Sequence, residues 1–244
     1  EACELFYDKD FFNKLDQNPY LLCFTNGVID FKAKKHRPGQ PDDYISKCTN
    51  IEYVRLNHTH DNFVEKIRTF MDQLFPNEQL KSYMWEHLAS VLIGTLDNQT
   101  FNIYTGSGRN GKSCLVSLMA KVLGDYKGTV PSTLITQKRT SIGSTSSEIV
   151  ALMGTRYAVM QEPSKGDKIN EGIMKEITGG DPIQGRALFK DTVTFIPQFK
   201  LVVTTNVLFD IKSNDDGTWR RIRVCDFESK FLDNPYNDDM HFPK

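Results

Sequence analysis

Apolar positions follow two different patterns along the chain, and the change lies near residue 95. In the first part, residues 21–25 and 28–31 are largely apolar and flank Asn26-Gly27. Because both central positions of a tight hairpin turn favour positive φ, this pattern predicts a β-hairpin with its turn at Asn26-Gly27. Residues 32–43 are basic and then rich in Pro and Gly, so we expect an exposed loop there.

Farther along the first part, apolar side chains recur at helical spacing in two stretches that Pro76-Asn77 separates. The two sets are Phe63, Ile67, Phe70, Met71 and Leu74, and then Leu80, Met84, Leu88, Val91 and Leu92. Side chains at such spacing share one face of a helix. We therefore expect two amphipathic helices whose apolar faces pack in the core.

From residue 96 onward, short apolar runs alternate with helical patterns. The runs expected to be strands are residues 101–104, 157–160, 201–205 and 222–224, and the stretches expected to be helices are 114–120, 148–153 and 169–177. This alternation predicts an α/β fold with a mostly parallel sheet and helices on both faces. Ligands bind such a sheet at the carboxyl ends of its strands.

Composition restricts the functional classes. The chain has 244 residues, with 30 Lys and Arg against 31 Asp and Glu. A protein that coats nucleic acid usually has a basic excess, so any nucleic-acid contact must be local. The apolar runs are too short to cross a membrane, and the five scattered cysteines without a C-x-x-C pair favour free thiols in a reducing compartment. Because the chain begins with Glu1, we expect a fragment of a longer protein.

The most specific motif is G-x-x-x-x-G-K-S, the phosphate-binding loop of nucleoside triphosphatases, between the strand 101–104 and the helix that follows it. Its residues are Gly106, Ser107, Gly108, Arg109, Asn110, Gly111, Lys112 and Ser113, and Cys114 follows in the helix. The glycines let backbone N–H groups point at phosphate oxygens. Lys112, expected to be a surface-facing charge, would contact the β- and γ-phosphates, and the Ser113 hydroxyl would bind Mg²⁺.

Three further features lie at strand ends. Glu162 follows the strand 157–160, where a carboxylate can hold Mg²⁺ or polarise the attacking water. Asn206 could orient that water or sense the γ-phosphate. Arg220 and Arg221 precede the last strand, and an arginine supplied to a neighbouring subunit stabilises the charge of the transition state. Each residue alone also suits a turn or a solvated surface, but their order after the phosphate loop favours a catalytic site. Arg221 is preferred to Arg220 because it abuts the strand.

This order of motifs resembles the superfamily 3 helicases, and more narrowly the poxvirus-type primase-helicases of large cytoplasmic DNA viruses and related phages. The closer likeness lies in residues 26–30, 175–181, 185–190 and 219–222. The resemblance implies an AAA+-like P-loop ATPase core that uses ATP, and a coupling role for Lys175. Many relatives carry two acids where this chain has Gln161 before Glu162, so Glu162 would serve for both.

The resemblance also implies an ATP-dependent DNA helicase of viral replication that works as a hexamer and moves 3′→5′ on single-stranded or forked DNA. Its partners would include a primase domain or other replication proteins and no membrane. Its location would be the host cell cytoplasm for a viral protein and the cytoplasm otherwise. The expected divisions are a smaller N-terminal helicase-associated α+β domain at 1–95, the ATPase at 96–228, and the start of a C-terminal extension at 229–244.

Physical reasoning agrees with a ring. A phosphate loop and Arg221 on opposite edges combine only if a neighbour supplies the arginine, and head-to-tail contacts of this kind close into rings. Residues 184–189 and 192–196 flank Lys190-Asp191, which predicts a hairpin with a charged tip. Rings of such tips would hold the phosphate backbone in a channel.

Two neighbours of Lys190 could assist it at the hairpin tip. Phe189 could stack on a base. Arg186 could steady the hairpin or touch a phosphate.

Two alternatives remain open at this point. A P-loop kinase would need an acceptor pocket and an arginine-rich lid, and would work as a monomer. A non-enzymatic nucleotide switch or ring-forming scaffold would not need a carboxylate at Glu162. Stimulation of ATP turnover by single-stranded DNA would separate the helicase from both.

Overall fold

The computed structural model describes residues 8, 10–136, 146–160, 169–208, 211 and 215–243. The described residues begin with a short helix, which is followed by a three-stranded antiparallel sheet of order β1-β2-β3. These elements are α2 (Phe11–Lys14), β1 (Leu21–Phe24), β2 (Gly27–Asp30) and β3 (Lys35–Arg37). The first two strands form the predicted hairpin, which is thereby confirmed.

The turn of this hairpin lies one residue earlier than predicted. Phe24 pairs with Gly27, so the turn residues are Thr25 and Asn26, and neither has a positive φ. The side-chain amide of Asn26 explains the shift, because it forms two hydrogen bonds with the backbone of Tyr53: Nδ2 donates to the carbonyl oxygen and Oδ1 accepts from the amide, both at 2.9 Å. A contact distant in sequence therefore determines this turn.

The segment 32–43 is not the simple loop that its composition predicts. It contains β3 and a short 3-10 helix, η1 (Pro41–Asp43). Arg37 in β3 forms a bidentate pair with Asp43, with N–O distances of 2.7 and 2.8 Å. The basic side chain expected at a loop surface instead joins the strand to this helix.

Two longer helices follow a second 3-10 helix, η2 (His58–His60), and both are confirmed: α3 (Asp61–Leu74) and α4 (Glu78–Ser90). Asn77 caps α4, since its Oδ1 accepts hydrogen bonds from two backbone amides of the first turn. The expectation of ordinary core packing is wrong for the first half of α3. Met71 and Leu74 are buried, whereas Phe63 is 64% and Ile67 44% exposed.

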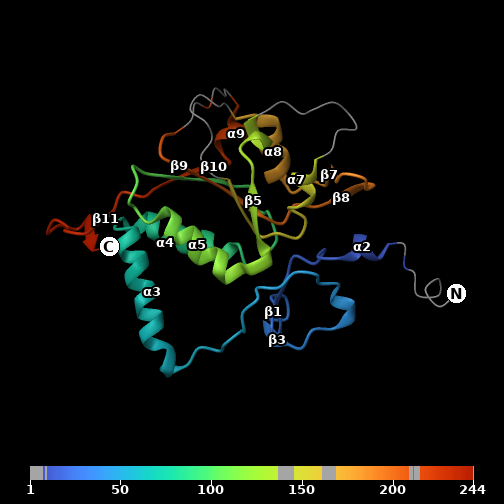
Figure 1. The fold of residues 1–244 in the computed structure, drawn as a ribbon, viewed down its shortest axis with the longest axis horizontal. Coiled ribbons are helices and arrows are strands. Elements are labelled where there is room, and N and C mark those ends of the chain that lie inside the picture. Colours follow the sequence, from blue (N-terminus) through green and yellow to red (C-terminus); the bar gives the residue numbers. More distant parts are fainter. Residues whose placement is uncertain are drawn as a thin grey trace.

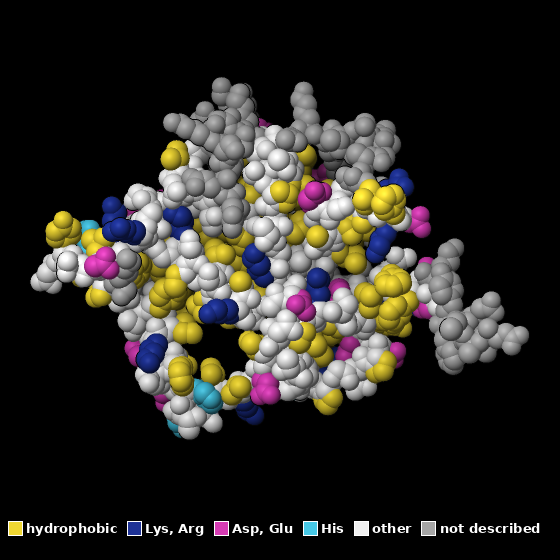
Figure 2. All heavy atoms as spheres, viewed as in Figure 1, with side chains coloured by type: hydrophobic (Ala, Val, Ile, Leu, Met, Phe, Trp, Pro, Cys, Tyr) yellow, Lys and Arg dark blue, Asp and Glu magenta, His cyan; other side chains and the backbone are white. Residues whose placement is uncertain are grey.

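The exposed half of α3 borders an open apolar groove. Its volume is about 690 Å³, and its lining comprises Leu56, Phe63, Val64, Ile67, Arg68, Asp72 and Trp85. Figure 2 shows hydrophobic side chains around this opening, between α3 and the segment that leads into it. The groove explains why the apolar stripe of α3 does not pack against the core along its whole length.

The second part of the chain is built on a five-stranded parallel sheet of order β10-β4-β9-β6-β5 (Figure 1). The strands are β4 (Phe101–Thr105), β5 (Lys127–Val130), β6 (Tyr157–Met160), β9 (Lys200–Thr205) and β10 (Ile222–Asp226). The predicted α/β class and parallel sheet are confirmed. The edge strand β5 was not predicted from the sequence.

Side chains of this sheet alternate between two hydrophobic clusters, one on each face. On one face, Tyr104, Val159 and Val202 pack with residues of α3, α4 and α5 (Lys112–Leu123). On the other face, Ile103, Met160 and Val203 pack with residues of α6 (Thr133–Thr136) and α8 (Glu171–Gly179). Helices therefore cover both faces, and α3 and α4 share a core with the sheet.

The remaining elements lie outside the sheet. They are η3 (Gly124–Tyr126), α7 (Ser147–Val150), the hairpin β7 (Ile183–Arg186) and β8 (Thr192–Phe195), α9 (Asp216–Trp219), and the parallel pair β11 (Lys230–Leu232) and β12 (His241–Pro243). Among the residues described here, no helix has the length and apolar character to cross a membrane.

Candidate nucleotide site

The phosphate loop connects the buried strand β4 to helix α5, as its sequence predicts. Gly106 and Gly111 both have positive φ, at 150° and 81°. A side chain at Gly106 would collide with the Asn110 amide and lie 2.7 Å from the carbonyl oxygen of Phe227, and one at Gly111 would collide with Leu74. Both glycines are therefore required by backbone conformation and by close neighbours.

The ammonium group of Lys112 lies over this loop. Its Nζ donates hydrogen bonds to the carbonyl oxygen of Gly106 at 2.6 Å, to Asn110 Oδ1 at 3.2 Å and to Asn206 Oδ1 at 3.3 Å. Lys112 is only 7% exposed, so the expectation of a surface-facing charge is wrong. The loop folds around the ammonium, and Asn206 at the end of β9 reaches the same group.

A cavity of about 350 Å³ opens beside Lys112 at the carboxyl ends of the strands. It is lined by Lys112, Ser113, Val116, Ser117, Lys127, Thr129, Val159, Thr204, Thr205 and Asn206. Ser113 is exposed in the first turn of α5, so its hydroxyl is accessible from the cavity, and Cys114 beside it is also exposed. A cation, a hydroxyl and an amide thus meet at the edge of the sheet where ligands bind in such folds.

Glu162 and Gln161 lie outside the described residues, which end in this region at Met160. The strand that precedes them, β6, borders the cavity through Val159. The assignment of Glu162 to the metal and the water stays a prediction.

Arg220 and Arg221 lie at the opposite end of the sheet. The backbone amide of Phe101, the first residue of β4, donates to the carbonyl oxygen of Arg221 at 2.7 Å, whereas the phosphate loop follows the last residue of that strand. Neither arginine is therefore near the phosphate loop of its own chain. An action on the nucleotide requires a neighbouring copy.

The two arginines differ in their surroundings. Arg221 is buried, and its guanidinium donates to the carbonyl oxygen of Gly217 at 2.6 Å and to Gln99 Oε1 at 2.9 Å. Arg220 is exposed and donates to the same Gln99 oxygen at 2.9 Å. Because an arginine finger must be accessible, the surroundings favour Arg220, the second choice from sequence.

Lys175 in α8 connects to the helix that precedes these arginines. Its Nζ pairs with the carboxylate of Asp215, and the hydrogen bond from Lys175 lowers the pKa of that carboxyl group. Asp215 caps α9 by accepting from the amide of Gly217 at 3.0 Å. Asp215 was not predicted as a site residue, although an Asp directly before a short helix is a usual cap signal.

The predicted hairpin is present, but its first strand ends at Arg186 rather than at Phe189, so residues 187–191 form the loop. Arg186 pairs with Thr192 at the end of the antiparallel ladder, and the loop that joins the strands carries Phe189, which is 93% exposed. The Arg186 Nε donates to the carbonyl oxygen of Lys190 at 3.1 Å, so of its two suggested roles the structure shows the one of steadying the hairpin. Lys190 itself is exposed.

Two family models match the chain. A family described as "D5 N terminal like" matches residues 4–90, and a family of unknown function, DUF5906, matches residues 104–221. The boundary between the two matches falls close to the change of pattern near residue 95.

Relatives come from large DNA viruses. The chain is 42% identical over 232 residues to the L207/L206 protein of Acanthamoeba polyphaga mimivirus, and 35% identical over 237 residues to the 121R protein of Invertebrate iridescent virus 3, both provisionally named helicases. It is also 28% identical over 237 residues to a provisionally named primase of African swine fever virus. Each alignment covers 95% of this chain but only 24%, 25% and 24% of the relative, so the chain spans about a quarter of their length.

Solved structures agree at the level of the fold. The apo structure of the NrS-1 C-terminal region superposes with a TM-score of 0.52 at 13% identity, covering 73% of this chain and 39% of that one. The predicted resemblance to proteins of large DNA viruses is confirmed by the relatives, which are provisionally named helicases and primases, and by the match to the "D5 N terminal like" family.

Proposed function

We propose that this chain, a relative of the provisionally named helicases and primases of large DNA viruses, is the ATP-hydrolysing core of a viral replication helicase. One observation carries the proposal. Lys112, Ser113 and Asn206 converge on one cavity at the carboxyl ends of a parallel sheet. A cation, a hydroxyl and an amide in this arrangement suit a bound triphosphate whose terminal phosphoryl group is attacked by water.

ATP and Mg²⁺ fit the residues around the cavity. Mg²⁺ prefers oxygen ligands and retains several waters, and the exposed Ser113 hydroxyl, with the carboxylate of Glu162, would hold it. Bound Mg²⁺ neutralises negative charge on the phosphates. Lys112 would hold the β- and γ-phosphates, and the Asn206 amide, which both donates and accepts, would orient the water.

In a ring, a neighbouring copy would supply an arginine to the nucleotide of this chain. Because Arg220 and Arg221 lie at the end of the sheet remote from the phosphate loop, they would act on the nucleotide of a neighbouring copy. Head-to-tail contacts of this kind close into rings. An AAA+-like, superfamily 3 hexamer is the assembly that we propose, with Lys175 and Asp215 joining α8 to the helix before the arginines.

DNA would pass through the centre of this ring. The exposed Phe189 offers an aromatic face for a base, and the exposed Lys190 offers a charge for a phosphate. We propose movement 3′→5′ on single-stranded DNA, cooperation with a primase domain or other replication proteins, and a role in the host cell cytoplasm.

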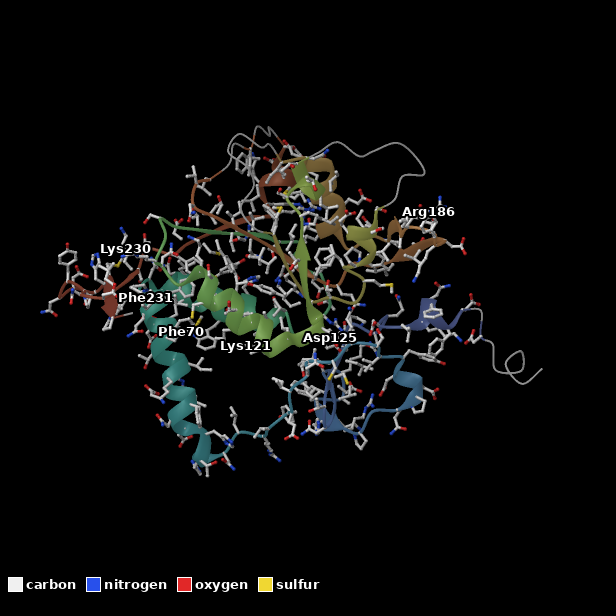
Figure 3. All side chains as sticks on the ribbon, viewed as in Figure 1. Phe70, Lys121, Asp125, Arg186, Lys230 and Phe231 are labelled. Atoms are coloured by element: carbon white, nitrogen blue, oxygen red, sulfur yellow. The ribbon has the colours of Figure 1, made fainter. Side chains whose placement is uncertain are left out.

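The test is ATP hydrolysis with and without single-stranded DNA. We expect the chain to hydrolyse ATP, and we expect DNA to stimulate turnover. Lys112→Ala should abolish hydrolysis because the triphosphate loses its cation. Lys121→Ala, which removes an exposed lysine from the far end of the same helix, should leave both activities intact (Figure 3).

Two results would overturn the proposal. Hydrolysis that persists in Lys112→Ala would remove the nucleotide site from the phosphate loop. ATP turnover that needs a small acceptor and ignores DNA would identify a P-loop kinase instead. Because Lys112 is buried, thermal unfolding of Lys112→Ala should be measured in parallel, so that loss of activity is not confused with loss of fold.

A further inference from the structure

The chain segment after β10 lies against the phosphate loop. The amide of Phe227 donates to the carbonyl oxygen of Thr105 at 2.8 Å, and the amide of Phe231 donates to that of Arg109 at 2.7 Å. The Phe231 ring also lies close to Gly111, because a Cβ atom placed on Gly111 would be 3.2 Å from a carbon of that ring. Figure 3 shows Phe231 at the C-terminal side of the molecule, on the strand β11. Residues 227–231 therefore pack against the phosphate loop.

Asn110 bridges this segment to the ammonium of Lys112. Its Nδ2 donates to the carbonyl oxygen of Phe227 at 3.3 Å, and its Oδ1 accepts from Lys112 Nζ at 3.2 Å. The reverse orientation of the amide would place an NH₂ group against the ammonium and an oxygen against the carbonyl. Both partners therefore select the same orientation, and the side chain is only 3% exposed.

The Asn110 bridge contacts the Lys112 ammonium, which has few N–H donors for the acceptors around it. An ammonium has three N–H donors, and the acceptors around Lys112 include a loop carbonyl, the Asn110 amide and the Asn206 amide. Triphosphate oxygens must compete with these acceptors. Any shift of Asn110 changes the position from which Lys112 meets the phosphates.

We propose that Asn110 is a positioning residue that couples the docking of residues 227–231 to the binding of the triphosphate. This inference rests on the proposed function for its ligand, ATP. Displacement of the segment would move the Asn110 amide and with it the ammonium of Lys112. Because coupling between two binding events is reciprocal, ATP would in turn strengthen the docking of the segment.

The experiment compares Asn110→Ala and Asn110→Asp with the wild-type chain. Asn234→Ala, which removes an exposed amide from the C-terminal tail, is the matched control. Hydrogen bonds to charged groups contribute about 1.5–3 kcal/mol, so Asn110→Ala should raise the Kd and the KM for ATP about ten- to a hundredfold.

Hydrogen exchange supplies the readout that a purely structural role would not move. In the wild-type chain, ATP should slow exchange of the Phe231 amide, which donates to the phosphate loop. In Asn110→Ala this dependence on ATP should be lost. Asn110→Asp keeps an acceptor for Lys112 but loses the donor to Phe227, so it should lose the ATP-dependent protection of residues 227–231.

The outcomes separate this inference from the proposed function. The coupling is refuted if the wild-type chain binds ATP through Lys112 and both Asn110 variants show the wild-type KM and the wild-type dependence of exchange on ATP. The proposed ATPase function would stand in that case. If the wild-type chain binds no ATP, the proposed function fails and this inference fails with it. Should Asn110→Ala not fold, the nearly isosteric Asn110→Asp decides the question through exchange at Phe231.

Discussion

His87 is a buried histidine at the junction of α4 with the parallel sheet. Its Nε2 lies 2.9 Å from the Tyr104 hydroxyl oxygen, and the Tyr157 hydroxyl oxygen lies 3.5 Å beyond that. Burial, and to a smaller extent the charge of Lys200, lowers the pKa of His87 to about 4. The imidazole is therefore neutral in the folded chain across the whole physiological pH range.

This shift predicts a stability that depends on pH. Between pH 6.5 and pH 4 the unfolded chain binds a proton at His87 and the folded chain does not, so the free energy of unfolding should fall as pH falls. The loss should total about 3 kcal/mol, by the usual conversion of a pKa shift into free energy. Chemical denaturation at pH 7 and pH 4.5 measures it.

A variant without the imidazole provides the comparison. His87→Gln should flatten the dependence in this window, while His58→Gln, at a fully exposed histidine, should keep it. An unchanged slope in His87→Gln would mean that another group causes the loss of stability.

Two buried cations show what local sequence could not predict. The Arg156 guanidinium donates to the carbonyl oxygens of Asn18, Pro19 and Leu21 at 2.7–3.2 Å. Lys200 Nζ donates to two further carbonyl oxygens after α4, and burial lowers its pKa to about 8. In the sequence, each is a polar residue beside a strand. Their partners are more than 100 residues away, so only the folded chain shows that they join the N-terminal part to β6 and β9.

At the scale of elements, the hairpin β7–β8 carries the DNA prediction. We expect Lys190→Ala and Phe189→Ala to keep basal ATP hydrolysis, because both side chains are exposed and belong to the loop between these strands. Both should lose unwinding and stimulation by DNA. Lys190→Ala should also reduce the salt dependence of single-strand binding, with a log–log slope lower by about 0.7 for each phosphate that the protein no longer neutralises.

Lys121→Ala again serves as the control for removal of an exposed lysine. Normal unwinding by Lys190→Ala would refute the hairpin assignment. The DNA site would then have to be sought at the basic segment 32–37, where Lys32, Lys34 and Lys35 remain candidates. Arg37 in that segment is already engaged by Asp43.

Helices and strands were predictable where the local sequence pattern agrees with the burial of the same residues in the folded chain. The strand β4, the phosphate loop and α5 follow from an apolar run, glycines and a helical repeat. The neighbouring positions of Lys112 and Asn206 follow from the rule that ligands meet the carboxyl ends of parallel strands. The strand β5 was missed because Lys127–Val130 has little apolar character and owes its conformation to pairing with β6. The bridge through Asn110 was also missed, since Phe227 lies 117 residues away.

At the scale of the whole molecule, the helices α3 and α4 pack into the core of the parallel sheet rather than forming a separate appendage. Leu74 of α3 lies against Gly111 of the phosphate loop, and Met84 and Leu88 of α4 share a cluster with Tyr104 of β4. In Figure 1, α3 extends away from the body toward the segment that carries η2. One end of this helix therefore packs against the phosphate loop, while the other borders the apolar groove.

The position of the arginines predicts a nucleotide site shared between copies. Removal of the arginine that acts as the finger should cut ATP hydrolysis by about 10³–10⁵. Arg220 is exposed, so Arg220→Ala should do this without lowering the melting temperature. Arg221→Ala should lower the melting temperature as well, because its guanidinium is buried and bonded to Gly217 and Gln99. Thermal unfolding and turnover, measured on both variants, identify the finger.

Mixing inactive variants then tests the ring itself. Lys112→Ala chains lack a working phosphate loop but retain both arginines, and Arg220→Ala chains retain the loop. When the two are mixed, some interfaces should join an intact loop to an intact arginine, so activity should return in part. The recovered activity should rise with protein concentration, because it depends on assembly. The ring is refuted if the mixture stays inactive and the wild-type turnover rate per chain does not change on dilution. One chain alone would then complete the site, and the positions of Arg220 and Arg221 would need another explanation.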